Sequence, residues 1–153
     1  MSARPFEPHA DLPTVSDCRV LPMAQHADAR GCLTVLERAT DLPFDVRRTF
    51  IIAGVSAGAM RGQHANLVTT ELIVCAAGAL TVRVEDGRSS RSIPLSPIGG
   101  AVLVPPSLWV ELRDFAPGTV VVVLADTDYR VARDAYIRDR ARWLASRGVT
   151  RVA

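Results

Sequence analysis

The sequence predicts an all-β protein, a barrel or sandwich of short strands, that ends in a C-terminal helix. Apolar and polar residues alternate in many short runs, as in residues 80–85, where Leu80, Val82 and Val84 are separated by polar side chains. Such alternation is typical of half-buried strands. Turn signals such as Gly99-Gly100 and Pro117-Gly118 separate the runs. Short strands at regular spacing favour a closed barrel or a two-sheet jelly roll.

The chain of 153 residues is long enough for a single domain with a sizeable core. We divide it into an N-terminal arm (residues 1–16), a barrel (17–128), and a C-terminal helix and tail (129–153). The arm is rich in proline and shows no periodicity, so we expect no regular structure there.

The expected strands follow from alternation and from the turns between them. Asp28 to Gly31 is a predicted turn, Leu42-Pro43 a loop, and Asp86-Gly87 a hairpin turn. Residues 120–124 are apolar on both faces, which indicates a strand in the interior of a sheet. The strands are expected at 18–23, 32–37, 46–53, 70–76, 80–85, 92–95, 101–104, 109–113 and 119–125.

Only the C-terminal segment has a helical pattern. Its apolar and long side chains share one side of a helix, and Gly148 is a suitable stop. We expect its many arginines to form a solvated face. The shared side comprises Tyr136, Ile137, Arg140, Ala141 and Leu144.

Composition excludes several classes of function. The net charge of +2 favours neither nucleic acid nor a membrane as partner. All 18 basic residues are arginine, so Schiff-base and lysine-base mechanisms are excluded. Cys18, Cys32 and Cys75 form no disulfide framework, and we expect Cys75 to be a buried free thiol. The sequence shows neither a signal peptide nor a membrane span, so we expect a cytoplasmic protein.

One stretch has the spacing of a known motif. Gly58 is followed after five residues by His64, which is separated by Ala65 from Asn66. Four residues separate Asn66 from Glu71, and six residues separate Glu71 from Gly78. This pattern resembles the first cupin motif, in which a second histidine stands at the position of Asn66. The resemblance implies a cupin-type double-stranded β-helix, or jelly roll.

The second cupin motif is expected after a variable gap. Gly99, Pro105, Ser107 and Val110 follow its spacing, with Ser107 in place of a glycine and Val110 in place of a histidine. In a metal cupin the histidines and the glutamate converge on one divalent ion, since imidazole and carboxylate suit such ions. Because an amide is a poor ligand and valine is none, we expect no metal in this pocket.

Further matches run along most of the chain, from about Asp28 to Ile137. They are Asp28-Ala-Arg-Gly31 with Leu33 and Glu37, Pro43-Phe44 before Arg47-Arg48, Arg61-Gly-Gln-His-Ala65, the Asp86-Gly87 hairpin, Trp109-Val-Glu111, Asp114-Phe115, Leu124-Ala125 and Tyr136-Ile137-Arg138. In these segments the chain resembles the dTDP-4-keto-6-deoxyhexose 3,4-ketoisomerases of deoxysugar biosynthesis.

The resemblance implies an activity. Such an enzyme shifts the keto group of a dTDP-linked 4-keto-6-deoxy sugar from C4 to C3 through an enediol, without a metal or cofactor, and is usually a homodimer. Two alternatives remain: a keto-sugar epimerase, and a non-catalytic or weakened protein that only binds the nucleotide sugar.

We assign the acid–base residues as follows. His64 falls on the first histidine of the family's motif Arg-Gly-x-His-Ala-His and is expected to be the acid or base at the sugar, since histidine titrates near neutrality. Asn66, at the second, would orient the substrate carbonyl or a water. Glu111 could supply the missing base if burial raises its pKa. The alternative for His64 is a hydrogen-bonded core residue.

Four more residues are expected to bind the substrate. Arg61 and Arg48 are candidates for the diphosphate, because guanidinium pairs well with phosphate oxygens. For Arg61 an ion pair with a nearby glutamate is the alternative. Glu71 would accept hydrogen bonds in the pocket. Trp109 could stack on a thymine or sugar ring, although a core position is commoner for tryptophan.

Overall fold

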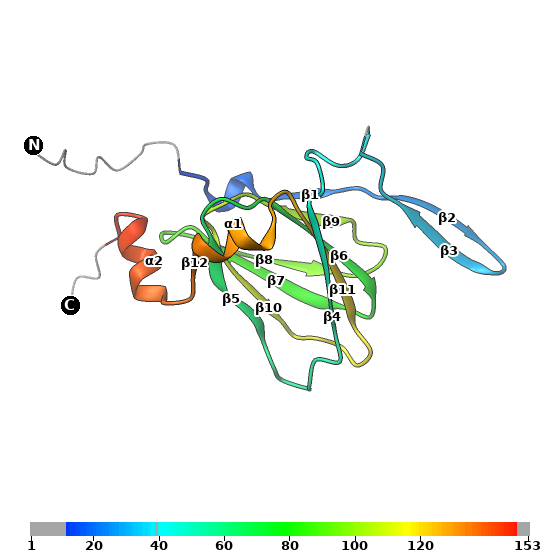
Figure 1. The fold of residues 1–153 in the computed structure, drawn as a ribbon. Helices are drawn as coiled ribbons and strands as arrows, with labels where there is room; N and C mark the ends of the chain where they lie inside the picture. The colour runs from blue at the N-terminus through cyan, green and yellow to red at the C-terminus, as the bar shows by residue number, and fades with distance from the viewer. Residues whose placement is uncertain (1–11, 39, 150–153) are drawn as a thin grey trace, which may run out of the picture.

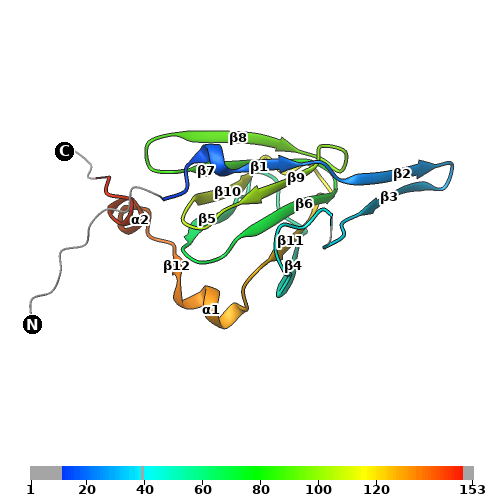
Figure 2. The same ribbon diagram turned by 90° about the horizontal axis from the view of Figure 1, so that it is seen from above.

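Two antiparallel sheets face each other across one core (Figures 1 and 2) in the computed structural model, which describes residues 12–38 and 40–149. Sheet I has the strand order β1 (Arg19–Leu21), β9 (Ala101–Val104), β6 (Glu71–Ala77), β11 (Val120–Ala125), β4 (Arg48–Ala53). Sheet II has the order β12 (Tyr136–Ile137), β5 (Arg61–Asn66), β10 (Trp109–Arg113), β7 (Leu80–Glu85), β8 (Ser90–Leu95). This is a cupin-like β-sandwich, so the predicted fold class is confirmed.

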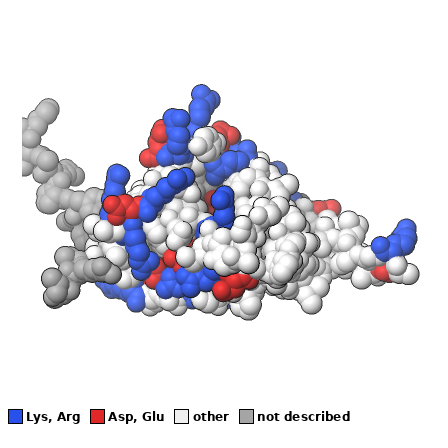
Figure 3. All heavy atoms as spheres, turned by 90° about the horizontal axis from the view of Figure 1, so that it is seen from below, with Lys and Arg blue, Asp and Glu red and all other residues white. Residues whose placement is uncertain are grey.

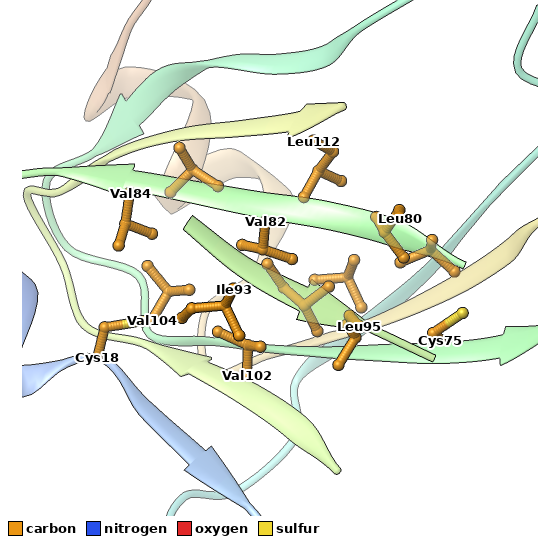
Figure 4. Packing of buried hydrophobic residues seen from close by; sticks show 14 of the residues in the cluster. Cys18, Cys75, Leu80, Val82, Val84, Ile93, Leu95, Val102, Val104 and Leu112 are labelled. Carbon is orange, nitrogen blue, oxygen red and sulfur yellow. The ribbon is translucent and has the colours of Figure 1, made fainter. Parts of the chain in front are cut away.

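The core lies between the sheets (Figure 4). Leu80, Val82 and Val84 of β7 face Val102 and Val104 of β9, and each of these side chains is buried. The intervening residues of β7 point to the outer face of sheet II. The alternation in the sequence therefore predicted correctly which residues of this strand enter the core.

Most predicted strands form with nearly the predicted bounds. The strand expected at 120–124 is β11, which pairs with β6 on one side and β4 on the other. It is therefore an interior strand of sheet I, as predicted.

The strand predicted at 32–37 forms as β3 (Gly31–Val35), but it is not half-buried. It pairs only with β2 (Ala24–Asp28) in a two-stranded hairpin that projects from the sandwich (Figure 1). The side chain of Leu33 is 63% exposed. The alternation is present, but no second layer formed by the described residues covers the apolar face of the hairpin.

The C-terminal segment differs from the prediction of one helix. Two short helices form, α1 (Tyr129–Asp134) and α2 (Arg140–Ser146), and the short strand β12 lies between them. β12 pairs with β5, so Tyr136 and Ile137 belong to sheet II and not to a helical face. A two-residue strand has no periodicity that could reveal it. Gly148, with φ of 69°, follows α2 as the predicted stop.

The ends of the chain and the cysteines complete the fold. The arm predicted at 1–16 lies mostly outside the described residues, but a 3₁₀-helix, η1 (Val15–Asp17), precedes β1, and Val15 packs against the core. Cys18 and Cys75 are buried free thiols, as expected for Cys75, and Cys32 is exposed and free. Neither helix in the described part of the chain is long and apolar enough to cross a membrane.

Candidate active site

A cavity of about 660 Å³ opens where the edge strand β4 of sheet I lies opposite β5 of sheet II. Its volume is typical of a small-molecule site. Strands β4, β5, β6 and β12 contribute to the wall, and α1 covers one side. The lining residues are Arg48, Phe50, Ile51, Ile52, Arg61, Gly62, His64, Asn66, Glu71, Tyr129, Ala132, Arg133, Tyr136 and Arg138.

A β-bulge in β5 aims His64 into this cavity. The register between β5 and β10 shifts there, because Val110 lies opposite His64 while Glu111 lies opposite Gly62. Gly62 and Gln63 both have positive φ, 80° and 57°. A Cβ at Gly62 would lie 2.7 Å from the carbonyl oxygen of Val110, so only glycine fits. Bulges of this kind often redirect a side chain beside an active site.

His64 stacks on Tyr136 from the neighbouring strand β12, with 4.2 Å between ring centroids. Burial lowers the pKa of His64 against the backbone of Gly62, which raises it, and the guanidinium groups of Arg138 and Arg48 add to the lowering. The neutral imidazole therefore dominates at neutral pH, which is the form that can take a proton. The buried Nδ1 has no hydrogen-bond partner among the described residues.

Asn66 and Glu71 form a second polar pair in the wall. Asn66 Nδ2 donates to Glu71 Oε1 at 3.3 Å, and both side chains are buried. Burial raises the pKa of Glu71, against the opposing effect of Arg48. The buried Oδ1 of Asn66 has no partner within the described part of the chain, so a bound ligand or water can satisfy it.

Four arginines make the cavity cationic: Arg48, Arg61, Arg133 and Arg138. The guanidinium of Arg48 lies 5.4 Å from the ring of Phe50 and 5.9 Å from that of Tyr129. In Figure 3, basic side chains gather over the part of the surface on the side of α1 and α2, whereas the part toward the hairpin is largely uncharged up to its tip. A cavity of this composition favours an anionic ligand.

The structure does not bring Glu111 and Trp109 to the cavity. Both lie on the outer face of β10, where Glu111 pairs with Arg83 and Arg113 and accepts a hydrogen bond from Trp109 Nε1. Trp109 packs against Trp143 of α2, at 5.5 Å between ring centroids. The alternate residues of β10 point into the core. The expected base at 111 and the expected stacking surface at 109 therefore face away from the other predicted site residues.

The remaining five predicted site residues line one cavity: Arg48, Arg61, His64, Asn66 and Glu71. Sequence reasoning missed the contribution of the C-terminal segment, which adds Tyr129, Arg133, Tyr136 and Arg138. Arg133 and Arg138 are exposed, as predicted for the arginines of this segment, but they also line the cavity. The family match at Tyr136-Ile137-Arg138 was the sequence signal that could have revealed two of these cavity residues.

The residues at the cupin metal positions do not offer a full ligand set. His64 and Glu71 could ligate, whereas Asn66 and Val110 stand at the other two positions, and Val110 is part of the core. No group of three or more His, Cys, Asp or Glu side chains that could hold a metal ion occurs within the described residues.

The fold and the cavity define a cupin-type protein with a cationic cavity of the size of a small-molecule site. Residues 16–148 match the protein family described as "FdtA: WxcM-like, C-terminal". The chain belongs to this family.

Relatives with known names support this assignment. The chain is 32% identical over 120 residues to the TDP-4-oxo-6-deoxy-alpha-D-glucose-3,4-oxoisomerase of Aneurinibacillus thermoaerophilus, an alignment that covers 78% of this chain and 85% of that protein. The sugar 3,4-ketoisomerase QdtA of Thermoanaerobacterium thermosaccharolyticum, solved in complex with TDP, superposes with a TM-score of 0.80 at 27% identity, over 86% and 94% of the two chains. A 3,4-ketoisomerase from Helicobacter canadensis gives 0.80 at 28%, over 86% and 98%.

Proposed function

We propose that this protein is a nucleotide-sugar 3,4-ketoisomerase, which moves the keto group of a TDP-linked 4-keto-6-deoxyhexose from C4 to C3. The single observation that carries the proposal is His64, a neutral imidazole aimed by a bulge into a cationic cavity of suitable size, in a chain of this family. The named relatives are a 3,4-oxoisomerase of a TDP-linked 4-oxo sugar and a 3,4-ketoisomerase solved with TDP, which favours the isomerase over the epimerase and over simple binding.

His64 is the base in this proposal. The carbonyl at C4 acidifies the hydrogen on C3, so a neutral imidazole can take that proton while the enediol forms. Returning the proton to C4 completes the shift. The stack on Tyr136 fixes the plane of the ring, and a fixed ring keeps its nitrogen near the reacting carbons.

Arg48 and Arg61 would bind the diphosphate, with Arg133 and Arg138 as further cations on the cavity wall. The unpartnered Oδ1 of Asn66 would accept a hydrogen bond from a sugar hydroxyl or a water.

Proton exchange tests the activity. The protein is incubated with dTDP-4-keto-6-deoxyglucose in deuterated water, and NMR follows the C3 proton and the 3-keto product. We expect loss of the C3 signal with product formation, and neither in His64→Asn. TDP binding by calorimetry should survive in the variant, which controls for folding. TDP binding by the natural chain without exchange or product would overturn the isomerase proposal in favour of a binding protein.

We further propose that the reaction needs no metal or cofactor. The support is the donor set, in which an amide and a valine occupy two of the four cupin ligand positions. Activity should be unchanged after dialysis against EDTA.

A homodimer and a cytoplasmic location complete the proposal. An apolar cluster on the outer face of sheet I is surrounded by partly buried apolar side chains from β1, β11 and the segments that flank the hairpin, and a second copy would cover them: Leu21, Met23, Leu36, Leu42, Phe44, Val122 and Leu124. Three free cysteines suit a reducing compartment.

A further inference from the structure

Three glutamates of this chain are buried to the same extent but differ in their partners. Glu71, Glu85 and Glu111 are 7%, 8% and 9% exposed. A buried carboxylate is costly unless it is paired with a cation, so the partners of each show which charge state the fold favours.

Glu85 and Glu111 lie on the outer face of sheet II and are held by arginines. Glu85 pairs with Arg140 and Arg83, and these partners lower its pKa to about 2. Glu111 pairs with Arg113 and Arg83. Both are therefore structural carboxylates, and Glu85 stays ionised.

Glu71 has no such partner. It forms no ion pair with any described residue, and the one hydrogen bond to it in the described part of the chain comes from the neutral amide of Asn66 to Oε1. The second oxygen, Oε2, accepts none there. Glu71 nevertheless lines the cavity that also holds His64. A buried carboxyl of this kind, with a free oxygen in a cavity, is available for chemistry.

The surroundings of Glu71 favour its neutral, protonated form. Burial raises its pKa against the opposing effects of Arg48 of β4 and of the hydrogen bond from Asn66, and Asp126 after β11 adds to the rise. The titratable and charged groups that line the same cavity or act on its pKa are Arg48, Arg61, His64, Asp126, Tyr129, Arg133, Tyr136 and Arg138.

The proposed reaction needs two proton movements. One proton leaves C3 and one arrives at C4; a second leaves the hydroxyl O3 and arrives at the carbonyl oxygen O4. A single histidine can serve the two carbons, but the oxygens need a second acid–base group. Asn66 cannot act as one, because an amide does not exchange protons at neutral pH.

We propose that Glu71 is this second group, and that it moves the proton between O3 and O4 while His64 moves the proton between C3 and C4. The inference rests on the proposed isomerase function and assigns a further catalytic residue to it.

The two steps balance. In the first step, His64 takes the C3 proton and the C3–H electrons form the C3=C4 bond. The π electrons of C4=O4 take the proton of the Glu71 carboxylic acid, and the product of this step is an enediol. In the second step, the Glu71 carboxylate takes the O3 proton and the O3–H electrons form the C3=O3 bond. The π electrons of C3=C4 take the proton from His64 onto C4. Both side chains return to their starting states.

The test compares Glu71→Gln with Glu71→Asp. Glutamine keeps the shape and the acceptor for Asn66 but cannot donate a carboxylic proton. We expect kcat of Glu71→Gln to fall at least about 100-fold, with TDP affinity unchanged.

Because the acid form starts the cycle, kcat of the natural protein should fall as pH rises through the pKa of Glu71. Glu71→Gln should lack this limb, and Glu71→Asp should keep it with a reduced kcat.

Glu85→Gln is the matched control, since it makes the same change at a glutamate of equal burial outside the cavity. We expect it to lower Tm while kcat and the high-pH limb persist. If the natural protein isomerises the sugar and Glu71→Gln stays within threefold of it with the same pH profile, the inference is overturned and the proposed function stands. If the natural protein binds TDP but performs no isomerisation, the proposed function fails and the role of Glu71 with it.

Discussion

The protonation state of His64 sets the acid limb of activity at the scale of the single residue. A base works only when deprotonated, so kcat/KM should be full above the pKa of His64 and fall as pH drops below it. Burial, Arg138 and Arg48 lower this pKa from its ordinary value of 6.5. We therefore expect the limb below pH 6.5 in a kcat/KM profile. A limb above that value would contradict the assignment of His64 as the base.

Gly62 permits a second test on a single residue. Alanine there meets both a left-handed φ and the carbonyl oxygen of Val110, whereas a Cβ added at Gly118, which has φ of 74°, would meet no atom within 4 Å. Gly118→Ala should cost about 1–2 kcal/mol for the backbone alone. Gly62→Ala should cost about 1–3 kcal/mol more from the clash.

The catalytic consequence separates the two glycine variants further. Misplacing His64 by about 1 Å can cost about 100-fold in rate, so only Gly62→Ala should lose activity beyond its loss of stability. Urea unfolding and steady-state kinetics on both variants measure this. Equal activities per folded molecule would show that the bulge does not position His64.

At the scale of the elements, α2 holds β12 and hence Tyr136 in place. Trp143 is fully buried, donates from Nε1 to the carbonyl oxygen of Ser107 at 2.9 Å, and packs on Trp109. Trp143→Ala should cost about 3–5 kcal/mol. Thermal unfolding measures the loss. Arg142→Ala on the same helix, with an exposed side chain, should leave Tm nearly unchanged.

The elements also show how far the sequence predicts this fold. β7, β9 and β10 were predicted with their observed bounds because turn residues delimit each run. Alternation also indicates the orientation of β10, since the apolar Val110 and Leu112 share one face and the charged Glu111 shares the other with Arg113. The expectation that Glu111 and Trp109 enter the cavity did not use this signal and was wrong. β12 was missed because its pairing with β5 depends on tertiary contact. The cavity residues after β11 were missed for the same reason.

At the scale of the whole molecule, the proposed homodimer predicts an effect of charge on one face. Val122 of β11 points to the outer face of sheet I, opposite to its core-facing neighbours Val121 and Val123. Val122→Arg would place a guanidinium in an apolar contact, where an unpaired charge is costly.

Sedimentation velocity should show a dimer for the natural chain and a monomer for Val122→Arg, with the sandwich still folded by circular dichroism. Ile98→Arg, in a turn where the side chain is 82% exposed, should remain a dimer. If Val122→Arg is as dimeric as the natural chain, the dimer contact lies elsewhere on the surface. If the natural chain is itself a monomer, the homodimer proposal fails and the half-exposed apolar face of sheet I has some other role.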